Sequence, residues 1–155
     1  MNEMQYETLI QEVAQNFLDL VGINGAVRVS GEEDSYRVQV ESDEAGILIG
    51  RRGETVAALQ LVIKQVVYNR VGKNVDKFHL IVNVGDWQER REDVLRSLAM
   101  SAVTKVKATN EPCHIYDLSP SERRFVHILL SEDQSVSTES EGEGRDRHLV
   151  VKPCE

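Results

Sequence analysis

The chain has 155 residues, of which 41% are hydrophobic and 28% are charged, and its formal net charge at pH 7 is -8. This length suits one ordinary domain or two small ones, and no apolar run is long enough to span a membrane. The polar, acidic start excludes a secretory signal, and two cysteines, Cys113 and Cys154, are too few for a disulfide framework. These features predict a cytoplasmic protein without membrane insertion, whose thiols stay reduced.

The first part of the chain, residues 1–85, predicts a domain that mixes helices and strands. Its elements follow from helical or alternating spacing of apolar residues: a helix over 4–21, strands over 26–30 and 35–40, a short helix over 43–49, a longer helix over 55–71 and a strand over 77–84. Because Gly85 follows the last of these strands, we expect the first domain to end there.

The second part, residues 86–155, predicts another small mixed domain. Its expected elements are a helix to about Ala108, a short strand over 113–118, a helix from Ser119 to about Leu130, and strands near 135–140 and 146–152. On the first helix we expect an apolar face of Trp87, Val94, Leu95, Leu98, Ala102, Val103 and Val106. The fold class predicted for the whole chain is therefore α+β.

Gly50 and Gly53 enclose Arg51 and Arg52, after an apolar run and just before the predicted helix at 55–71. Glycine permits positive φ and the close approach of another backbone, and the amides and dipole of the following helix attract an anion. The pattern therefore predicts a loop that holds phosphate groups, although Gly-x-x-Gly alone also occurs in ordinary turns. A nucleotide P-loop would need a longer glycine loop ending in Gly-Lys-Ser/Thr, and the sequence contains none.

Charge is distributed unevenly along the chain. Residues 46–91 carry 8 Lys/Arg and 4 Asp/Glu, a net of +4, whereas residues 1–45 and 92–155 carry nets of -8 and -4. The glycine loop thus lies in the net-basic segment, and a local basic patch attracts a polyanion even on an acidic protein. The surrounding negative charge is expected to keep non-specific affinity modest.

Arg123 and His127 stand four residues apart on the predicted helix that follows Ser119. Four residues turn a helix by about 400°, so the two side chains lie about 40° apart on one face. Phe125 and Leu129 are expected to point the opposite way, into the core. An arginine beside a histidine suits a phosphate or a stacked base, although such a pair is also common on a solvated helix face.

The order of elements around the glycine loop is similar to that of a type II, bacterial KH domain, and Ile49-Gly50-Arg51-Arg52-Gly53 resembles its I-G-x-x-G signature. In that family the loop holds the backbone of about four nucleotides, whose bases lie in an apolar groove. The resemblance implies that the two arginines contact phosphate. The residues that it implies for the border of the groove are Ile47, Ile49 and Val56.

The spacing of Arg123 and His127 within 121–127 resembles the Arg-x-x-x-His signature of the R-three-H domain, a small fold that binds single-stranded nucleic acid. Residues 138–142 and then Arg147 resemble the strand–loop–strand of the same domain. The resemblance implies that Arg145 and Arg147 lie near the helix face that carries the signature.

A KH domain followed directly by an R-three-H domain resembles the bacterial Jag family, also known as SpoIIIJ-associated protein or KhpB, over roughly residues 4–153. The resemblance implies RNA binding, a role in post-transcriptional control and cell-envelope growth, and a small KH protein as partner. Many members carry a Jag-N domain before the KH domain. Because this chain starts at the KH helix, the Jag-N domain is expected to be absent.

The nucleic-acid contacts that we predict are Ile49, Gly50, Arg51, Arg52, Gly53, Arg123, His127 and Arg147. The ligand is expected to be single-stranded RNA, with single-stranded DNA and a protein-interaction adaptor as alternatives. Cys113 and His114 are neighbours on a predicted strand and so face opposite ways, which disfavours a thiolate–imidazole pair. The histidines and cysteines show no spacing typical of metal ligands. We therefore predict no catalytic residue, no metal and no cofactor.

Overall fold

The computed structural model describes residues 2–72 and 79–154. Both halves of the chain contain helices and strands, which confirms the α+β class. The chain separates into two compact units, Met1–Gln88 and Glu89–Glu155. The strand predicted over 77–84 is observed from His79 onward, and residues 77 and 78 lie outside the described residues.

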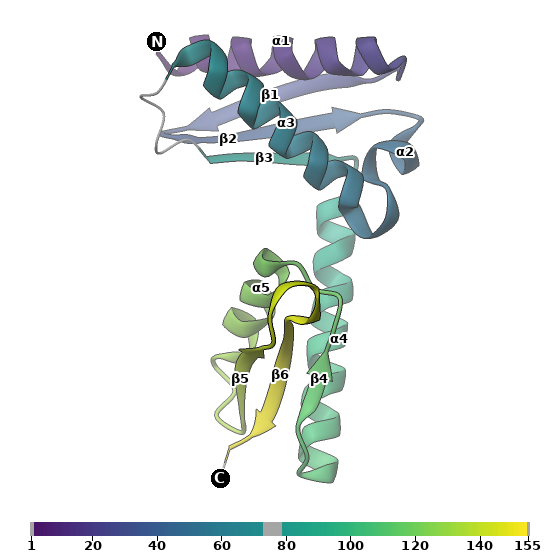
Figure 1. Ribbon diagram of the computed structural model, residues 1–155, viewed down its shortest axis with the longest axis vertical. Coiled ribbons are helices and arrows are strands. Elements are labelled where there is room, and N and C mark those ends of the chain that lie inside the picture. Colours follow the sequence, from purple (N-terminus) through teal and green to yellow (C-terminus); the bar gives the residue numbers. More distant parts are fainter. Residues whose placement is uncertain (1, 73–78, 155) are drawn as a thin grey trace. The chain divides into compact units, whose positions relative to one another are not determined.

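Among its described residues, the first unit contains three strands and three complete α-helices, drawn from purple to teal in Figure 1. In chain order they are α1 (Glu3–Val21), β1 (Ala26–Glu32), β2 (Ser35–Glu41), α2 (Ala45–Ile49), a 3-10 turn η1 (Arg51–Gly53), α3 (Glu54–Val71) and β3 (His79–Val84). The strand order is β1-β2-β3; β1 and β2 are antiparallel, and β2 and β3 are parallel.

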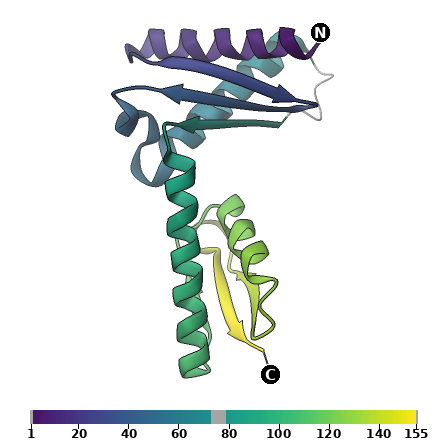
Figure 2. The same ribbon diagram turned by 180° about the vertical axis from the view of Figure 1, so that it is seen from behind.

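The sheet of the first unit has one face covered by helices. Helix α1 packs on β1, α3 packs on β3, and the two helices contact each other, so they lie on the same side of the sheet. Figure 2 shows the opposite face of this sheet, with α3 behind it. Alternation places Val38 and Val40 of β2 in the core between sheet and helices. Because α2 contacts both α3 and the edge strand β3, the loop between α2 and α3 lies at that edge of the sheet.

The second unit contains the remaining elements. They are most of α4 (Trp87–Thr109), then β4 (Cys113–Ile115), α5 (Pro120–Leu130), β5 (Val136–Glu141), a 3-10 turn η2 (Gly144–Asp146) and β6 (His148–Pro153). The strands form an antiparallel sheet of order β4-β6-β5. Helix α5 starts with a capping box, in which the Ser119 side chain accepts from the Glu122 amide and the Glu122 side chain accepts from the Ser119 amide.

One face of the second sheet packs against α4 and α5. Leu149 and Val151 of β6 are in this core together with Ala99 of α4 and Val126 of α5. Since side chains alternate along a strand, His148 of β6 points to the other face. The sheet therefore has one face that belongs to the core and one that carries polar side chains.

The predicted apolar face of α4 is partly wrong. Leu95, Ala102, Val103 and Val106 are buried as expected, but Val94 and Leu98 are 53% and 40% exposed. Ala99 is fully buried in their place. Trp87 packs against the core of the first unit, not that of the second. The buried face of α4 is thus narrower than predicted and includes Ala99 in place of Leu98.

No helix among residues 2–72 and 79–154 is long and apolar enough to cross a membrane.

Candidate nucleic-acid interface

The loop between α2 and α3 has an unusual backbone that explains its two glycines. Gly50 has φ 69° and ψ -171°, and Gly53 has φ 78° and ψ 13°. The conformation of Gly50 is essentially restricted to glycine, and that of Gly53 is left-handed. Arg52 is also left-handed, with φ 52°, which costs a residue other than glycine roughly 1–2 kcal/mol. The loop is therefore held in a strained shape by its surroundings.

Close contacts also require glycine at both positions. A Cβ atom on Gly50 would overlap the hydroxyl of Thr55 and would lie 2.7 Å from the Thr55 Cβ. A Cβ atom on Gly53 would lie 2.6 Å from Cζ2 of Trp87. Gly46, by contrast, has no atom within 4 Å of such a Cβ and keeps an ordinary helical backbone in α2. The two glycines of the motif are thus structural, and the side chains of Arg51 and Arg52 are what the loop presents.

The loop has the features of an anion-binding site. The side chains of Arg51 and Arg52 are exposed. Gly53 is the N-cap of α3 and provides no side-chain cap to the first amides of this 18-residue helix, of which the Glu54 amide donates to the Arg51 carbonyl. Such amides point toward the N-terminus with the positive end of the helix dipole and favour a negatively charged ligand. Two guanidinium groups therefore lie beside the N-terminus of a long helix.

The apolar residues around the loop divide into core and surface. Ile49 is 8% exposed and Val56 is 6% exposed, and both belong to the hydrophobic core. Ile47 is 62% exposed. Ile47 is thus accessible to a ligand, whereas Ile49 and Val56 support the loop from the hydrophobic core.

Asn83 of β3 holds the start of α4 in place against the loop. Its side chain is buried, at 5% exposure, although strand alternation assigns this position to the open face. The Asn83 amide group donates to the Gln39 side chain at 3.0 Å and to the Gly85 carbonyl at 3.1 Å, and its oxygen accepts from the Gln88 backbone amide at 3.1 Å. Trp87, one residue before Gln88, is thereby positioned to cover Gly53.

In the second unit, the predicted residues Arg123, His127 and Arg147 come together around one hollow of about 440 Å³. The hollow lies between α5 and β5, and its complete lining is Pro120, Arg123, Arg124, His127, Thr138, Ser140, Arg147 and Leu149. None of these lining residues is acidic and three are arginines, so the hollow favours an anionic group. Arg145, which the resemblance placed nearby, does not line it.

Hydrogen bonds hold the charged side chains of the hollow in place. Nη1 of Arg123 donates to the Leu118 carbonyl at 2.8 Å and reaches the Arg147 carbonyl at 3.5 Å. Nη1 of Arg147 donates to the Gly142 carbonyl at 3.0 Å. Nδ1 of His127 lies 2.5 Å from Oγ1 of Thr138. The side chains are thus oriented before any ligand arrives, which reduces the entropy lost on binding.

Sequence reasoning on the helix face alone missed part of this lining. Thr138 and Ser140 share a face of β5 because they are two residues apart, and this spacing was available in the sequence. Phe125 and Leu129 contact the core as predicted, but Val126 and Leu130 are the fully buried residues of α5. The buried face of the helix is therefore turned from the predicted one.

The cysteine and histidine neighbours on β4 lie as alternation predicts. Cys113 is half-buried against the core of the second unit, and His114 is exposed on the other face. His114 does have a partner that the sequence did not reveal. Its Nδ1 lies 2.9 Å from Nε2 of His148 on the neighbouring strand.

Comparisons with known proteins match both units. The family model described as "KhpA/KhpB, KH domain" matches residues 7–79, and the model of the R-three-H domain matches residues 93–153. Both are domain families and neither is an enzyme family.

Relatives named "RNA-binding protein KhpB" match along most of the chain. The relative from Clostridium symbiosum is 35% identical over 94% of this chain and 66% of its own length. The relative from Streptococcus pneumoniae serotype 2 is 29% identical over 95% of this chain and 44% of its own length. The relative from Bacillus subtilis is 29% identical over 88% of this chain and 65% of its own length. The chain thus spans less than two thirds of these relatives. The chain thus has a KH domain over residues 7–79 that is similar to that of KhpA and KhpB, followed by an R-three-H domain over residues 93–153, and most of its length is similar to proteins named RNA-binding protein KhpB.

Proposed function

We propose that this chain binds single-stranded RNA, with the loop of Gly50, Arg51, Arg52 and Gly53 as the main contact to the RNA backbone. One observation carries the proposal: glycine-dependent geometry presents two exposed arginines next to the N-terminus of α3. Phosphate groups fit both partners, because guanidinium groups bind them in a bidentate manner and helix amides bind them through hydrogen bonds. The name of the relatives supports RNA as the ligand.

The hollow lined by Arg123, His127 and Arg147 is proposed as a second contact on the same RNA strand. Its oriented guanidinium groups suit a phosphate, and the exposed imidazole of His127 suits a stacked base. Two weak sites joined in one chain bind more tightly than either alone, since the second event becomes intramolecular. Ile49 and Val56 contribute by supporting the loop, and Ile47 is the apolar side chain proposed to contact a base.

The decisive variant is Arg51→Asp with Arg52→Asp. Aspartate tolerates the left-handed conformation at position 52 better than most residues, so the fold is expected to persist. The matched control is Arg28→Asp with Arg37→Asp, which reverses the same charge at two exposed arginines of β1 and β2. Binding to a labelled single-stranded RNA is measured by fluorescence anisotropy, and folding by circular dichroism.

We expect the loop variant to lose RNA affinity by about tenfold or more and the control to lose much less. If each of the two arginines neutralises a phosphate, the slope of log affinity against log salt becomes shallower by about 1.4, since each contact to a single strand contributes about 0.7. Equal losses in the two variants would show that only net charge matters, and would refute a specific contact at the loop.

Two alternatives are separated by the same assay. A single-stranded DNA of identical sequence competes equally if the chain reads only the phosphate backbone, whereas preference for RNA indicates contact with the 2′-hydroxyl. A protein-interaction adaptor would show neither a steep dependence on salt nor a loss in the loop variant.

The wider role is also a proposal. The resemblance to the Jag family supports a cytoplasmic regulator of RNA after transcription, linked to cell-envelope growth and paired with a small KH protein. Crosslinking in cells followed by sequencing of the bound RNA tests the first part, and co-purification of a KH protein with the tagged chain tests the second.

A further inference from the structure

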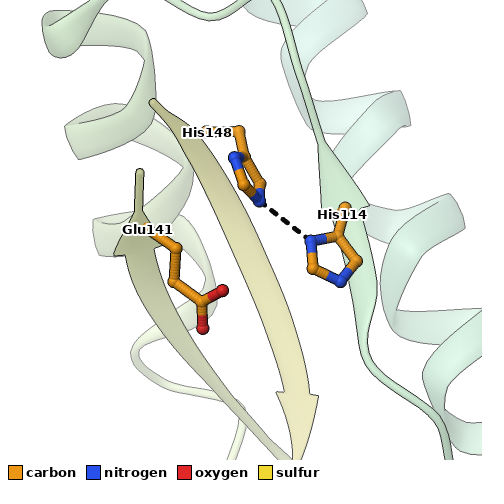
Figure 3. Close-up of side chains that lie close together, drawn as sticks. All are labelled: His114, Glu141 and His148. Atoms are coloured by element: carbon orange, nitrogen blue, oxygen red, sulfur yellow. Dashed lines mark hydrogen bonds between the residues drawn. The ribbon is translucent and has the colours of Figure 1, made fainter. Parts of the chain in front are cut away.

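Three side chains on the sheet of the second unit converge away from the hollow described above. His114 comes from β4, Glu141 from the end of β5 and His148 from the start of β6, and Figure 3 shows them on one face of the sheet. One ligand atom from each residue lies within 4.8 Å of the other two. Strand pairing creates this arrangement, since Glu141 is directly opposite His148, and His114 is opposite Val150, two residues further along β6.

The hydrogen bonds of His148 determine which of its ring nitrogens is available. Its Nδ1 lies 2.8 Å from the carbonyl oxygen of Asp146, and a carbonyl oxygen can only accept, so Nδ1 carries a proton. The lone pair of the neutral ring is then on Nε2, which faces Nδ1 of His114 at 2.9 Å. An imidazole whose second nitrogen donates to a backbone carbonyl is the usual state of a histidine that binds a metal. The ring also stacks on Tyr116, with centroids 4.4 Å apart, which restricts its rotation.

The geometry points to a site for a transition-metal ion such as Zn²⁺, held by Nδ1 of His114, Nε2 of His148 and a carboxylate oxygen of Glu141. Two imidazoles and one carboxylate are a donor set that zinc prefers, with bonds of about 2.0–2.2 Å and a fourth position for water. On binding, His114 takes its other neutral tautomer, with the proton on Nε2, and the rings separate slightly to admit the ion. This site lies on the opposite sheet face from the hollow that we propose for RNA.

Lys152 is the competitor for the carboxylate in the structure. Its Nζ lies 2.8 Å from Oε1 of Glu141 and 2.7 Å from Oε2 of Glu139. Lys152 thus forms ion pairs with both carboxylates in the structure. Because Lys152 can keep Glu139 as its partner, Glu141 is able to turn toward a metal ion. Removing the lysine amine should therefore strengthen metal binding.

The test is calorimetric titration of the full chain with ZnCl₂, in a Cys154→Ser background that removes an exposed thiol. We expect one Zn²⁺ per chain. His114→Ala and His148→Gln should each weaken binding by about tenfold or more, by comparison with the 10–100-fold that changes around metal ligands cause. His79→Ala, which removes an exposed histidine of the first unit, is the matched control and should not change the affinity.

Lys152→Met is a variant that should change Zn²⁺ affinity in the direction opposite to the histidine variants, and a folding defect does not produce such a gain. We expect it to raise Zn²⁺ affinity and Glu141→Gln to lower it, while the circular dichroism of both variants stays that of the parent chain. Zinc should also raise the unfolding temperature of the parent, and excess EDTA should reverse this effect.

Absence of stoichiometric binding, or equal binding by His114→Ala and His79→Ala, would overturn the proposal. A third result would do the same: if His114→Ala and His148→Gln weaken binding of the labelled RNA and leave Zn²⁺ binding unchanged, the exposed rings serve as a stacking surface.

Discussion

Gly50→Ala should destabilise the KH domain far more than Gly46→Ala, although the two glycines are only four residues apart. An alanine at position 50 has to adopt a φ of 69° with ψ -171°, which costs about 1–3 kcal/mol. Overlap of its Cβ with Thr55 adds about 1–3 kcal/mol, as for an overpacked core. The gain from a less flexible unfolded chain is about 0.5–1 kcal/mol. We therefore expect a net loss of about 1–5 kcal/mol.

Position 46 provides the internal control, because its backbone is helical and open space surrounds an added Cβ. There alanine should stabilise the chain by about 0.5–1 kcal/mol. Urea unfolding is followed by the fluorescence of Trp87, the single tryptophan of the chain, which packs on the core of the first unit. Neutral surface changes alter the free energy of unfolding by up to about 0.5 kcal/mol. If the free energies of unfolding of the two variants differ by no more than this, the backbone of the loop is not the one described.

Two further predictions concern packing and pH. Gly53→Ala and Trp87→Ala should each destabilise the first unit by about 2–3 kcal/mol. The double variant should lose less than the sum of these two values, because removal of the indole relieves the clash at 2.6 Å. Additive losses of unfolding free energy, measured by circular dichroism, would contradict that contact. Glu122→Gln removes the ion pair with Nε of Arg91 at 2.6 Å and should cost about 1–2 kcal/mol at pH 7. Burial alone raises the pKa of Glu122, but hydrogen bonds from Arg91 and Ser119 lower it below 4.5 overall. The ion pair therefore stabilises the fold above pH 4.5, and this contribution is lost as the pH falls through the lowered pKa of Glu122. The gap between Glu122→Gln and the parent should therefore close in acid, and a gap independent of pH would refute this role.

Local patterns in the sequence predicted most elements of the fold. The capping box at Ser119 and Glu122 and the alternation in β1 and β2 depend on neighbours in sequence, and these elements were predicted to within a few residues. The apolar face of α4 was less predictable, because large residues such as Val94 and Leu98 dominate a periodicity argument. Ala99 is buried instead, since close packing on the sheet favours a small side chain there.

The features that could not be predicted depend on contacts distant in sequence. Asn83 looked like a solvent-facing strand residue, yet its amide serves as a hydrogen-bonding centre for Gln39, Gly85 and Gln88. His114 and His148 meet only because β4 and β6 pair in a particular register. A shift of that register by one residue would send one ring to the other face of the sheet, so no spacing in the sequence signals the pair.

The cover that Trp87 gives to Gly53 affects how this KH domain is best isolated for study. The family model ends at residue 79 and sequence reasoning placed the boundary at Gly85, yet the indole that packs on the loop lies beyond both. A fragment cut at either position would also lose Gln88, whose backbone amide satisfies the buried Asn83 side chain. Weak RNA binding by such a fragment would therefore reveal where the chain had been cut, not how well the loop recognises its ligand.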